Sequence, residues 1–113
     1  MDTSKPIRAA IYLRCARQDQ IAIDAQEHIC KEYSSRKGYE IAGIYTDNGV
    51  AGTSGSRPAL DRLRADAAAG AFDKIAVADY SRIARRPQQA AKLFDEMKKH
   101  GVAIESTKEG ALV

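Results

Sequence analysis

Short apolar runs alternate with helix-like segments along this chain. Residues 9–13 are apolar or small, which is enough for a strand covered on both faces. After Asp19, apolar and aromatic residues recur every three or four positions, as expected for an amphipathic helix that ends at Lys37-Gly38. The residues expected to face the core of this helix are Ala22, Ala25, Ile29 and Tyr33. The chain therefore begins with a strand, a short polar turn and a helix.

The same alternation continues to the end of the pattern. Strands are predicted at 39–45, 74–79 and 102–104, and helices at 58–69 and 87–100, each opened by a proline. The expected core positions of these two helices are Leu60, Leu63, Ala67, Ala90, Leu93, Phe94 and Met97. Thr46 to Gly49 has the composition of a turn, and the tail from Glu105 is too weakly patterned for a prediction.

This order of elements predicts an α/β fold, with a mostly parallel sheet of four to five strands and helices on both faces. The 113 residues are expected to form one domain, 1–113, with a core large enough to fold without a metal or a disulfide. The segment from Asp47 to Ser56 is rich in Gly, Ser and Thr, and Val50 is its main apolar anchor. We expect this long loop to be mobile and to have a function.

Composition narrows the class of protein. The chain is 44% hydrophobic and 29% charged with a net charge of +3, which is typical of a folded globular protein rather than a disordered one. No apolar run approaches the roughly 18 residues that span a bilayer, and the polar N-terminus lacks a signal-peptide core. We therefore expect a cytoplasmic protein without a membrane partner. Cys15 and Cys30 lack metal-type spacing and are expected to be reduced and partly buried.

Arginines follow the predicted strands. Arg14 and Arg17 come after the first strand and Arg57 ends the long loop, while a further group follows the third strand, namely Arg82, Arg85 and Arg86. Parallel strands place their carboxyl ends at one edge of the sheet, where these guanidinium groups could bind phosphate through bidentate hydrogen bonds. The alternative is a set of scattered surface arginines that pair with Asp and Glu. Composition and spacing alone favour this alternative.

Several segments resemble, in sequence and order, the catalytic domain of the serine recombinases, the resolvase and invertase family. The resemblance covers residues 7–106. No segment is specific by itself, but their shared order and spacing indicate a shared fold. The segments are Tyr12-x-Arg14-x-Ala16-x-x-x-Gln20, Ala22-Ile23-Asp24-Ala25-Gln26, Tyr45-Thr46-Asp47-Asn48-Gly49-Val50-Ala51-Gly52-Thr53-Ser54, Arg57-Pro58 and Ser81-Arg82-Ile83-Ala84-Arg85.

The resemblance implies site-specific DNA recombination. Members of the family cut DNA with a serine hydroxyl, form a 5′-phosphoserine link and exchange strands between subunits, with no metal or nucleotide cofactor. The implied partners are DNA and other recombinase subunits, and the expected strand order is 2-1-3-4. The arginines implied to stabilise the attacked phosphate are Arg14, Arg57, Arg82 and Arg85, with Gln26 and Ser81 as supporting polar contacts. Arg17 and Arg86 are expected at the solvated surface.

Two departures from the family concern the chemistry. The nucleophile of the Tyr-x-Arg-x-Ser pattern falls at residue 16, which is Ala16 here, and a loop serine is replaced by Ala51. Cys15 could substitute as a nucleophile only if a bulge re-aimed it, because neighbouring strand residues point to opposite faces. Whether the chain is an enzyme stays open at this point. We expect the chain as written to form no covalent adduct with DNA.

Two hypotheses of different classes remain. The first is the catalytic domain of a DNA recombinase, without the family's long dimerisation helix and DNA-binding domain, and with its nucleophile changed. The second is a degenerate, recombinase-like regulatory protein that binds DNA or a recombinase partner. The nucleophile could have been changed deliberately, to trap an intermediate, or lost in evolution. Serine is absent at both Ala16 and Ala51, which favours loss in evolution, because a deliberate change needs only one substitution. A flavodoxin-like domain unrelated to DNA is a third, weaker alternative. In the first two cases, DNA binding should be weak and salt-sensitive.

Overall fold

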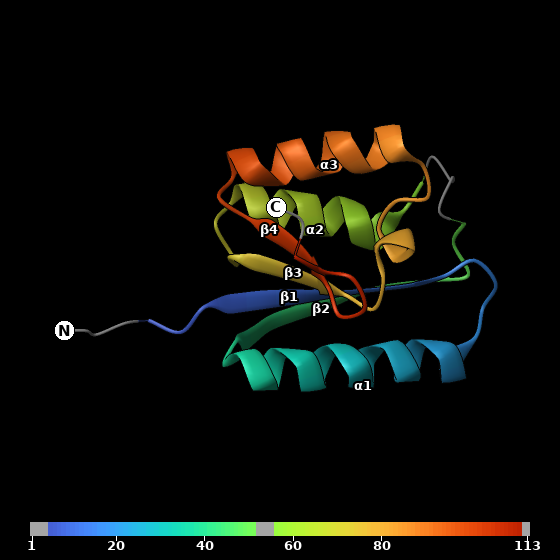
Figure 1. The fold of residues 1–113 in the computed structure, drawn as a ribbon. Helices are drawn as coiled ribbons and strands as arrows, with labels where there is room; N and C mark the ends of the chain where they lie inside the picture. Colours follow the sequence, from blue (N-terminus) through green and yellow to red (C-terminus); the bar gives the residue numbers. More distant parts are fainter. Residues whose placement is uncertain (1–4, 52–55, 112–113) are drawn as a thin grey trace.

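A five-stranded sheet lies between two layers of helices in the computed structural model, which describes residues 5–51 and 56–111 (Figure 1). Helix α1 covers one face of the sheet, and α2 and α3 cover the other. The strands are β1 (Arg8–Cys15), β2 (Glu40–Asn48), β3 (Lys74–Val77), β4 (Ala103–Ser106) and β5 (Gly110–Ala111). The helices are α1 (Gln20–Lys37), α2 (Pro58–Ala68), α3 (Pro87–Lys99) and the short 3₁₀ helix η1 (Tyr80–Arg82).

The strand order is β2-β1-β3-β4-β5, which confirms the predicted 2-1-3-4 arrangement. The first four strands are parallel, and β5 pairs antiparallel with β4. The sequence did not predict β5, because two residues are too few to show a period. The α/β fold class is confirmed.

Some predicted boundaries and two predicted core positions of α1 are wrong. Strand β2 continues through the expected turn to Asn48, and β3 ends at Val77 rather than Asp79. In helix α1, Ala22 packs against the core and Tyr33 is half-buried, as expected, but Ala25 and Ile29 are exposed. The buried residues of α1 are Ile23, Gln26, Cys30 and Ser34. Two of these are polar, and a search for apolar spacing misses them.

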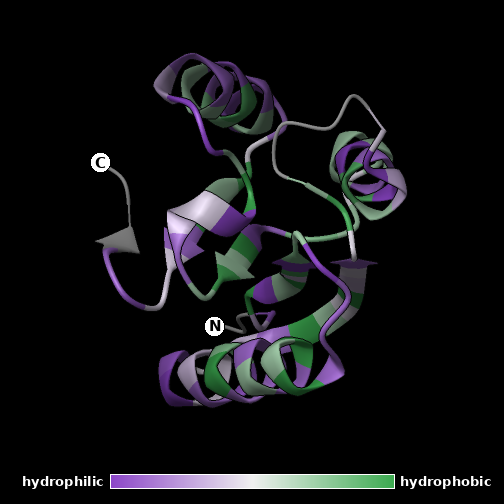
Figure 2. Cartoon of the chain, turned by 90° about the vertical axis from the view of Figure 1, so that its right-hand side faces the viewer, coloured by the Kyte–Doolittle hydropathy of each residue, from purple (hydrophilic) through white to green (hydrophobic). Residues whose placement is uncertain are grey.

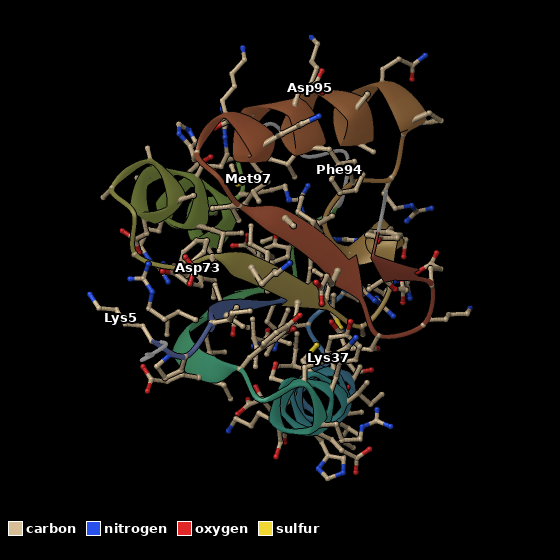
Figure 3. The ribbon with its side chains drawn as sticks, turned by 60° about the vertical axis from the view of Figure 1, so that its left-hand side comes forward. Lys5, Lys37, Asp73, Phe94, Asp95 and Met97 are labelled. Carbon is tan, nitrogen blue, oxygen red and sulfur yellow. The ribbon has the colours of Figure 1, made fainter. Side chains whose placement is uncertain are left out.

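Strand β1 is buried on both faces and divides the core. Ala10 and Tyr12 pack in the cluster beneath α2 and α3, whereas Ile11 and Leu13 pack in the cluster above α1. Helices α2 and α3 turn apolar residues toward this core (Figure 2). Helix α3 shows the pattern clearly, with Met97 facing the sheet and Asp95 on the opposite side (Figure 3).

Within residues 5–51 and 56–111, none of the helices has the length and apolar character needed to cross a membrane.

Candidate functional site

The connections that follow β1, β2 and β3 lie together at the carboxyl edge of the sheet, on the right in Figure 1. Backbone N–H groups of Gly49 and Val50 both donate to the Cys15 carbonyl, at 2.8 and 2.9 Å. The side-chain oxygen of Asn48 accepts from the Asp19 N–H at 2.9 Å. Gly49 has a φ of 84°, a conformation that favours glycine. These bonds fix the turn after β1 against the end of β2.

Arg14 lies at the end of β1 and is only 2% exposed. Its guanidinium donates to the carbonyl oxygens of Arg82 at 2.8 Å, Ser81 at 2.9 Å and Val50 at 3.0 Å. Charge-assisted bonds of this kind are short and directional. Arg14 therefore links η1 to the loop that follows β2.

Arg57 precedes α2 and is also buried, with 7% of its surface exposed. It donates to the Ile83 carbonyl at 2.8 Å, the Arg82 carbonyl at 2.9 Å and the Tyr12 hydroxyl at 2.9 Å. The Arg82 carbonyl thus accepts from two arginines, Arg14 and Arg57. Both buried guanidinium groups therefore bind backbone carbonyls of η1, and Arg57 also binds the carbonyl of Ile83, the residue that follows η1.

Asp47 is a site residue to which the sequence analysis gave no role, although it lies in the predicted turn and in a segment of the family resemblance. It is 3% exposed and accepts from the Tyr12 hydroxyl at 2.7 Å and from the N–H groups of Ala59 at 2.9 Å and Leu60 at 3.1 Å. Asp47 thereby caps α2, whose own N-cap residue, Arg57, provides no side-chain cap. Burial and the hydrogen bond to Asp47 raise the pKa of Tyr12, which stays a neutral donor. The sequence offered one indication of this role: an aspartate near the end of a strand, followed along the chain by a helix that begins with a proline.

Arg82 is more accessible than the two buried arginines, because 32% of its side chain is exposed. Its Nε lies 3.3 Å from a carboxylate oxygen of Asp79, and its Nη1 donates to the Arg14 carbonyl at 3.3 Å. Asp79 also accepts from the N–H of Ser81 at 3.0 Å and from its hydroxyl. Asp79 therefore caps η1 and orients two of the predicted site residues.

Arg85 is exposed and lies close enough to Arg14 to act on it electrostatically. Burial lowers the pKa of Arg14 first, and the positive charges of Arg57, Arg82 and Arg85 lower it further. We call Arg14, Arg57, Arg82 and Arg85 the arginine cluster. An anion at this edge would relieve the mutual repulsion that the cluster contains.

Gln26 joins α1 to the end of β1. Its side-chain amide accepts from the Arg14 N–H at 3.2 Å and donates to the Arg14 carbonyl at 3.0 Å, and it lies 3.4 Å from the sulfur of Cys15. These backbone bonds explain why a glutamine of α1 is buried. Gln26 holds the strand end from which the next residue, Ala16, emerges at the surface.

Cys15 points away from the arginine cluster, as strand alternation predicts. It is 6% exposed and packs with Ile11, Leu13 and Cys30 in the cluster above α1. Burial raises the pKa of Cys30 to about 12, so this thiol stays protonated. Neither thiol is placed to act at the arginine cluster.

The structure brings Arg14, Arg57, Arg82 and Ser81 together through direct hydrogen bonds, with Arg85 nearby. Arg17 and Arg86 are exposed. The loop from Asp47 to Ser56, for which mobility was predicted, starts with two residues that belong to β2, and residues 52–55 lie outside the described residues.

Comparisons with known proteins agree with this geometry. Residues 9–112 match the family model described as "Resolvase, N terminal domain". A protein of Bacillus subtilis (strain 168) named "Putative DNA recombinase" is 30% identical over 99 residues, which cover 84% of this chain and 19% of that protein. The chain thus spans about a fifth of the length of this curated relative.

Solved structures give the same result. The N-terminal catalytic domain of TP901-1 integrase is 30% identical, with a TM-score of 0.86 over 91% of this chain and 79% of that one. A resolvase family site-specific recombinase from Streptococcus pneumoniae is 26% identical, with a TM-score of 0.81 over 92% of this chain and 74% of that one.

Proposed function

Because the chain belongs to the resolvase family, we propose that it is a serine recombinase-type domain of DNA recombination, whose arginine cluster binds a backbone phosphate of DNA. The observation that carries this proposal is the arrangement of the cluster itself. Hydrogen bonds link Arg14, Arg57 and Arg82 at the carboxyl edge of the sheet, and the positive charges of Arg57, Arg82 and Arg85 all oppose the charged form of Arg14. A phosphate is the ligand whose charge and oxygen geometry suit such a set.

The residues divide into two roles. Arg82 and Arg85 are accessible and would contact the non-bridging oxygens of a phosphate. Arg14 and Arg57 donate to carbonyls of the segment that carries Arg82, so they would hold that segment and add positive potential. Ser81 and Gln26 would support these groups through Asp79 and the end of β1. Fixed positive charge stabilises a phosphate under attack more than a resting one.

The chain lacks the group that would attack. Residue 16 lies just beyond the end of β1, at the surface, but its side chain is a methyl group. Cys15 is buried on the other face of the sheet. We therefore propose that the chain binds phosphate without forming a bond to phosphorus.

Two cellular roles fit this chemistry. In the first, the chain works as the catalytic domain of a recombinase with an altered nucleophile and assembles with other recombinase subunits. In the second, it is a degenerate, recombinase-like regulatory domain that binds DNA or a recombinase partner. The absence of a hydroxyl at both Ala16 and Ala51 favours the second. In both cases, residues 1–113 act as a single domain.

The first experiment tests for a covalent intermediate. A suicide DNA substrate that traps phosphoserine should give no adduct with the unmodified chain. Ala16→Ser, in a version extended with the remaining domains of an active relative, should give an adduct, because the arginine cluster is already in place. Adding Arg82→Ala should abolish this adduct, a loss of at least about 100-fold, whereas Arg86→Ala should preserve it.

The outcomes separate the two roles. No adduct after Ala16→Ser would favour the degenerate role, since other parts of the site would then have changed too. An adduct from the unmodified chain that disappears in Cys15→Ala would contradict the proposal and make Cys15 the nucleophile. Binding of a short duplex should weaken as salt increases. Tight, sequence-specific binding by the chain alone would reveal a recognition element outside the arginine cluster.

A further inference from the structure

The turn between β4 and β5 has a local structure of its own. The hydroxyl oxygen of Ser106 accepts from the N–H groups of Lys108 at 3.1 Å and Glu109 at 3.0 Å, and the hydroxyl donates to Oε1 of Glu109 at 2.6 Å. Ser106 and Glu109 are thus joined by two hydrogen bonds that both involve the serine hydroxyl, one to the backbone N–H of Glu109 and one to its carboxylate. The Glu109 carboxylate is therefore held in one orientation.

The same turn forms hydrogen bonds with the segment that leads into η1. Oε1 of Glu109 accepts the N–H of Tyr80, the first residue of η1, at 3.1 Å. The N–H of Thr107 donates to the Val77 carbonyl at 2.9 Å, and its hydroxyl donates to the Ala78 carbonyl at 3.0 Å. Residues of the β4–β5 turn thus form hydrogen bonds with the segment that connects the end of β3 to the start of η1.

Helix η1 is consequently held on two sides. Arg14 and Arg57 bind its carbonyl groups from one side, and Glu109 binds its first N–H from the other. The ring of Tyr80 packs edge-to-face on Phe94 of α3, with the ring centres 5.6 Å apart. Asp79 also caps η1, so the three-residue helix that carries Ser81 and Arg82 is oriented by contacts from β1, from the loop before α2 and from the β4–β5 turn.

We infer that Glu109 is a positioning residue of the phosphate site: it fixes η1 through the Tyr80 N–H and thereby sets where Ser81 and Arg82 meet a phosphate. The inference rests on the proposed function of the arginine cluster. A shift of about 1 Å in a supporting segment is enough to weaken a site made of directional hydrogen bonds. The β4–β5 turn is therefore a structural part of the site, although its sequence gave no pattern.

The test uses the 113-residue chain, with amide hydrogen exchange and binding of a 20-base-pair duplex at low salt. Glu109→Ala should speed exchange of the Tyr80 amide by about tenfold, because the acceptor is lost. The same variant should weaken DNA binding by about three- to tenfold. Glu109→Gln keeps an oxygen that can accept from both Tyr80 and Ser106, so it should restore both values. Lys108→Ala is the matched control, since Lys108 contributes its backbone N–H to the turn.

The readouts distinguish positioning from general stability. Unchanged Tyr80 exchange in Glu109→Ala would overturn the inference, as would failure of Glu109→Gln to restore binding. An equal loss of binding in Lys108→Ala would also contradict it. Absence of DNA binding by the parent chain would overturn the proposed function and, with it, the role of Glu109 in the site. If Glu109→Ala still speeds exchange of the Tyr80 amide in that case, Glu109 does hold η1, and the claim that fails is DNA binding by the arginine cluster.

Discussion

Two polar clusters lie on opposite faces of the same sheet, and they differ in the balance of positive and negative charge. On the α1 side, the 5% exposed carboxylate of Glu105 accepts from the hydroxyls of Tyr33 at 2.8 Å and Tyr39 at 2.9 Å and pairs with Lys74 at 3.2 Å. We call these four residues the Glu105 cluster. At the carboxyl edge, the four members of the arginine cluster are all cations. Asp79 pairs with one of them, Arg82, at 3.3 Å, and the hydroxyl of Tyr12 lies between buried Asp47 and Arg57.

The pKa directions follow from this difference. Burial alone would raise the pKa of Glu105, but the two tyrosine hydroxyls and Lys74 lower it, so the carboxylate is stabilised as an anion. Arg14 shows the reverse, since burial and its cationic neighbours both lower its pKa and thus oppose its charged form. The Glu105 cluster thus stabilises the charge that it buries, whereas the arginine cluster has an excess of positive charge that suits an anionic ligand.

The largest expected effect comes from Asp47→Ala. This change removes the cap of α2 and the carboxylate that shares the Tyr12 hydroxyl with Arg57, so we expect a loss of about 4 kcal/mol in the free energy of unfolding. Asp47→Asn keeps oxygen and nitrogen in place and should lose about half as much. Urea unfolding followed by circular dichroism measures both. A loss below about 1 kcal/mol for Asp47→Ala would mean that the arginines do not depend on this carboxylate.

Glu105→Gln should have the next largest effect, about 2 kcal/mol, because it removes the charge that Lys74 and both tyrosines stabilise. Since the folded pKa lies below the ordinary value of 4.5, Glu105 contributes stability above pH 4.5 that is lost as the pH falls through the folded pKa. The variant should therefore lose part of the acid sensitivity of the parent. Unfolding measured between pH 3 and pH 7 tests this, and parallel curves for the two proteins would contradict it.

Much of this comparison could be predicted from the sequence, but only at the level of strands. Alternation within β1 places Arg14 and Cys15 on opposite faces, and the strand order brings Arg82 to the same edge as Arg14. The different exposure of Arg14 and Arg82 could not be predicted, because it depends on carbonyl groups from distant segments. The role of Asp47 was missed for the same reason: its partners lie 12 or more positions along the chain.

Helix α1 shows a second limit. Its apolar spacing pointed to Ala25 and Ile29, yet the helix is oriented by Gln26, whose amide binds both backbone groups of Arg14. A buried polar residue with a complete set of partners looks like a surface residue in the sequence. Only the family resemblance identified Gln26 beforehand.

A smaller effect is expected at alkaline pH in the Glu105 cluster. The pKa of Tyr39 is raised from 10.0 to about 12 by burial and then by the Glu105 carboxylate. A group whose folded pKa is raised contributes stability below pH 10 that is lost as the pH rises toward 12. Tyr39→Phe should cost about 1.5 kcal/mol at pH 7 and have less effect at pH 12. Equal costs at both pH values would show that folding does not raise the pKa of the Tyr39 hydroxyl.

The smallest effect tests whether the excess positive charge of the arginine cluster binds an anion. Sulfate that binds only the folded chain should stabilise it by about 1 kcal/mol near a concentration of five times the dissociation constant. Sulfate also stabilises proteins in general by exclusion from their surfaces, so the informative value is the difference between variants measured at one concentration.

Arg85→Ala removes an exposed member of the cluster and should reduce the increase in melting temperature that sulfate causes. Arg86→Ala changes the neighbouring exposed arginine and should leave this increase unchanged. Glu105→Gln should also keep the full increase, because its cluster already matches its own charge. Equal increases in all of these variants would mean that the arginine cluster is satisfied by its own carbonyl groups, and the contrast between the two faces would then be one of geometry rather than of charge.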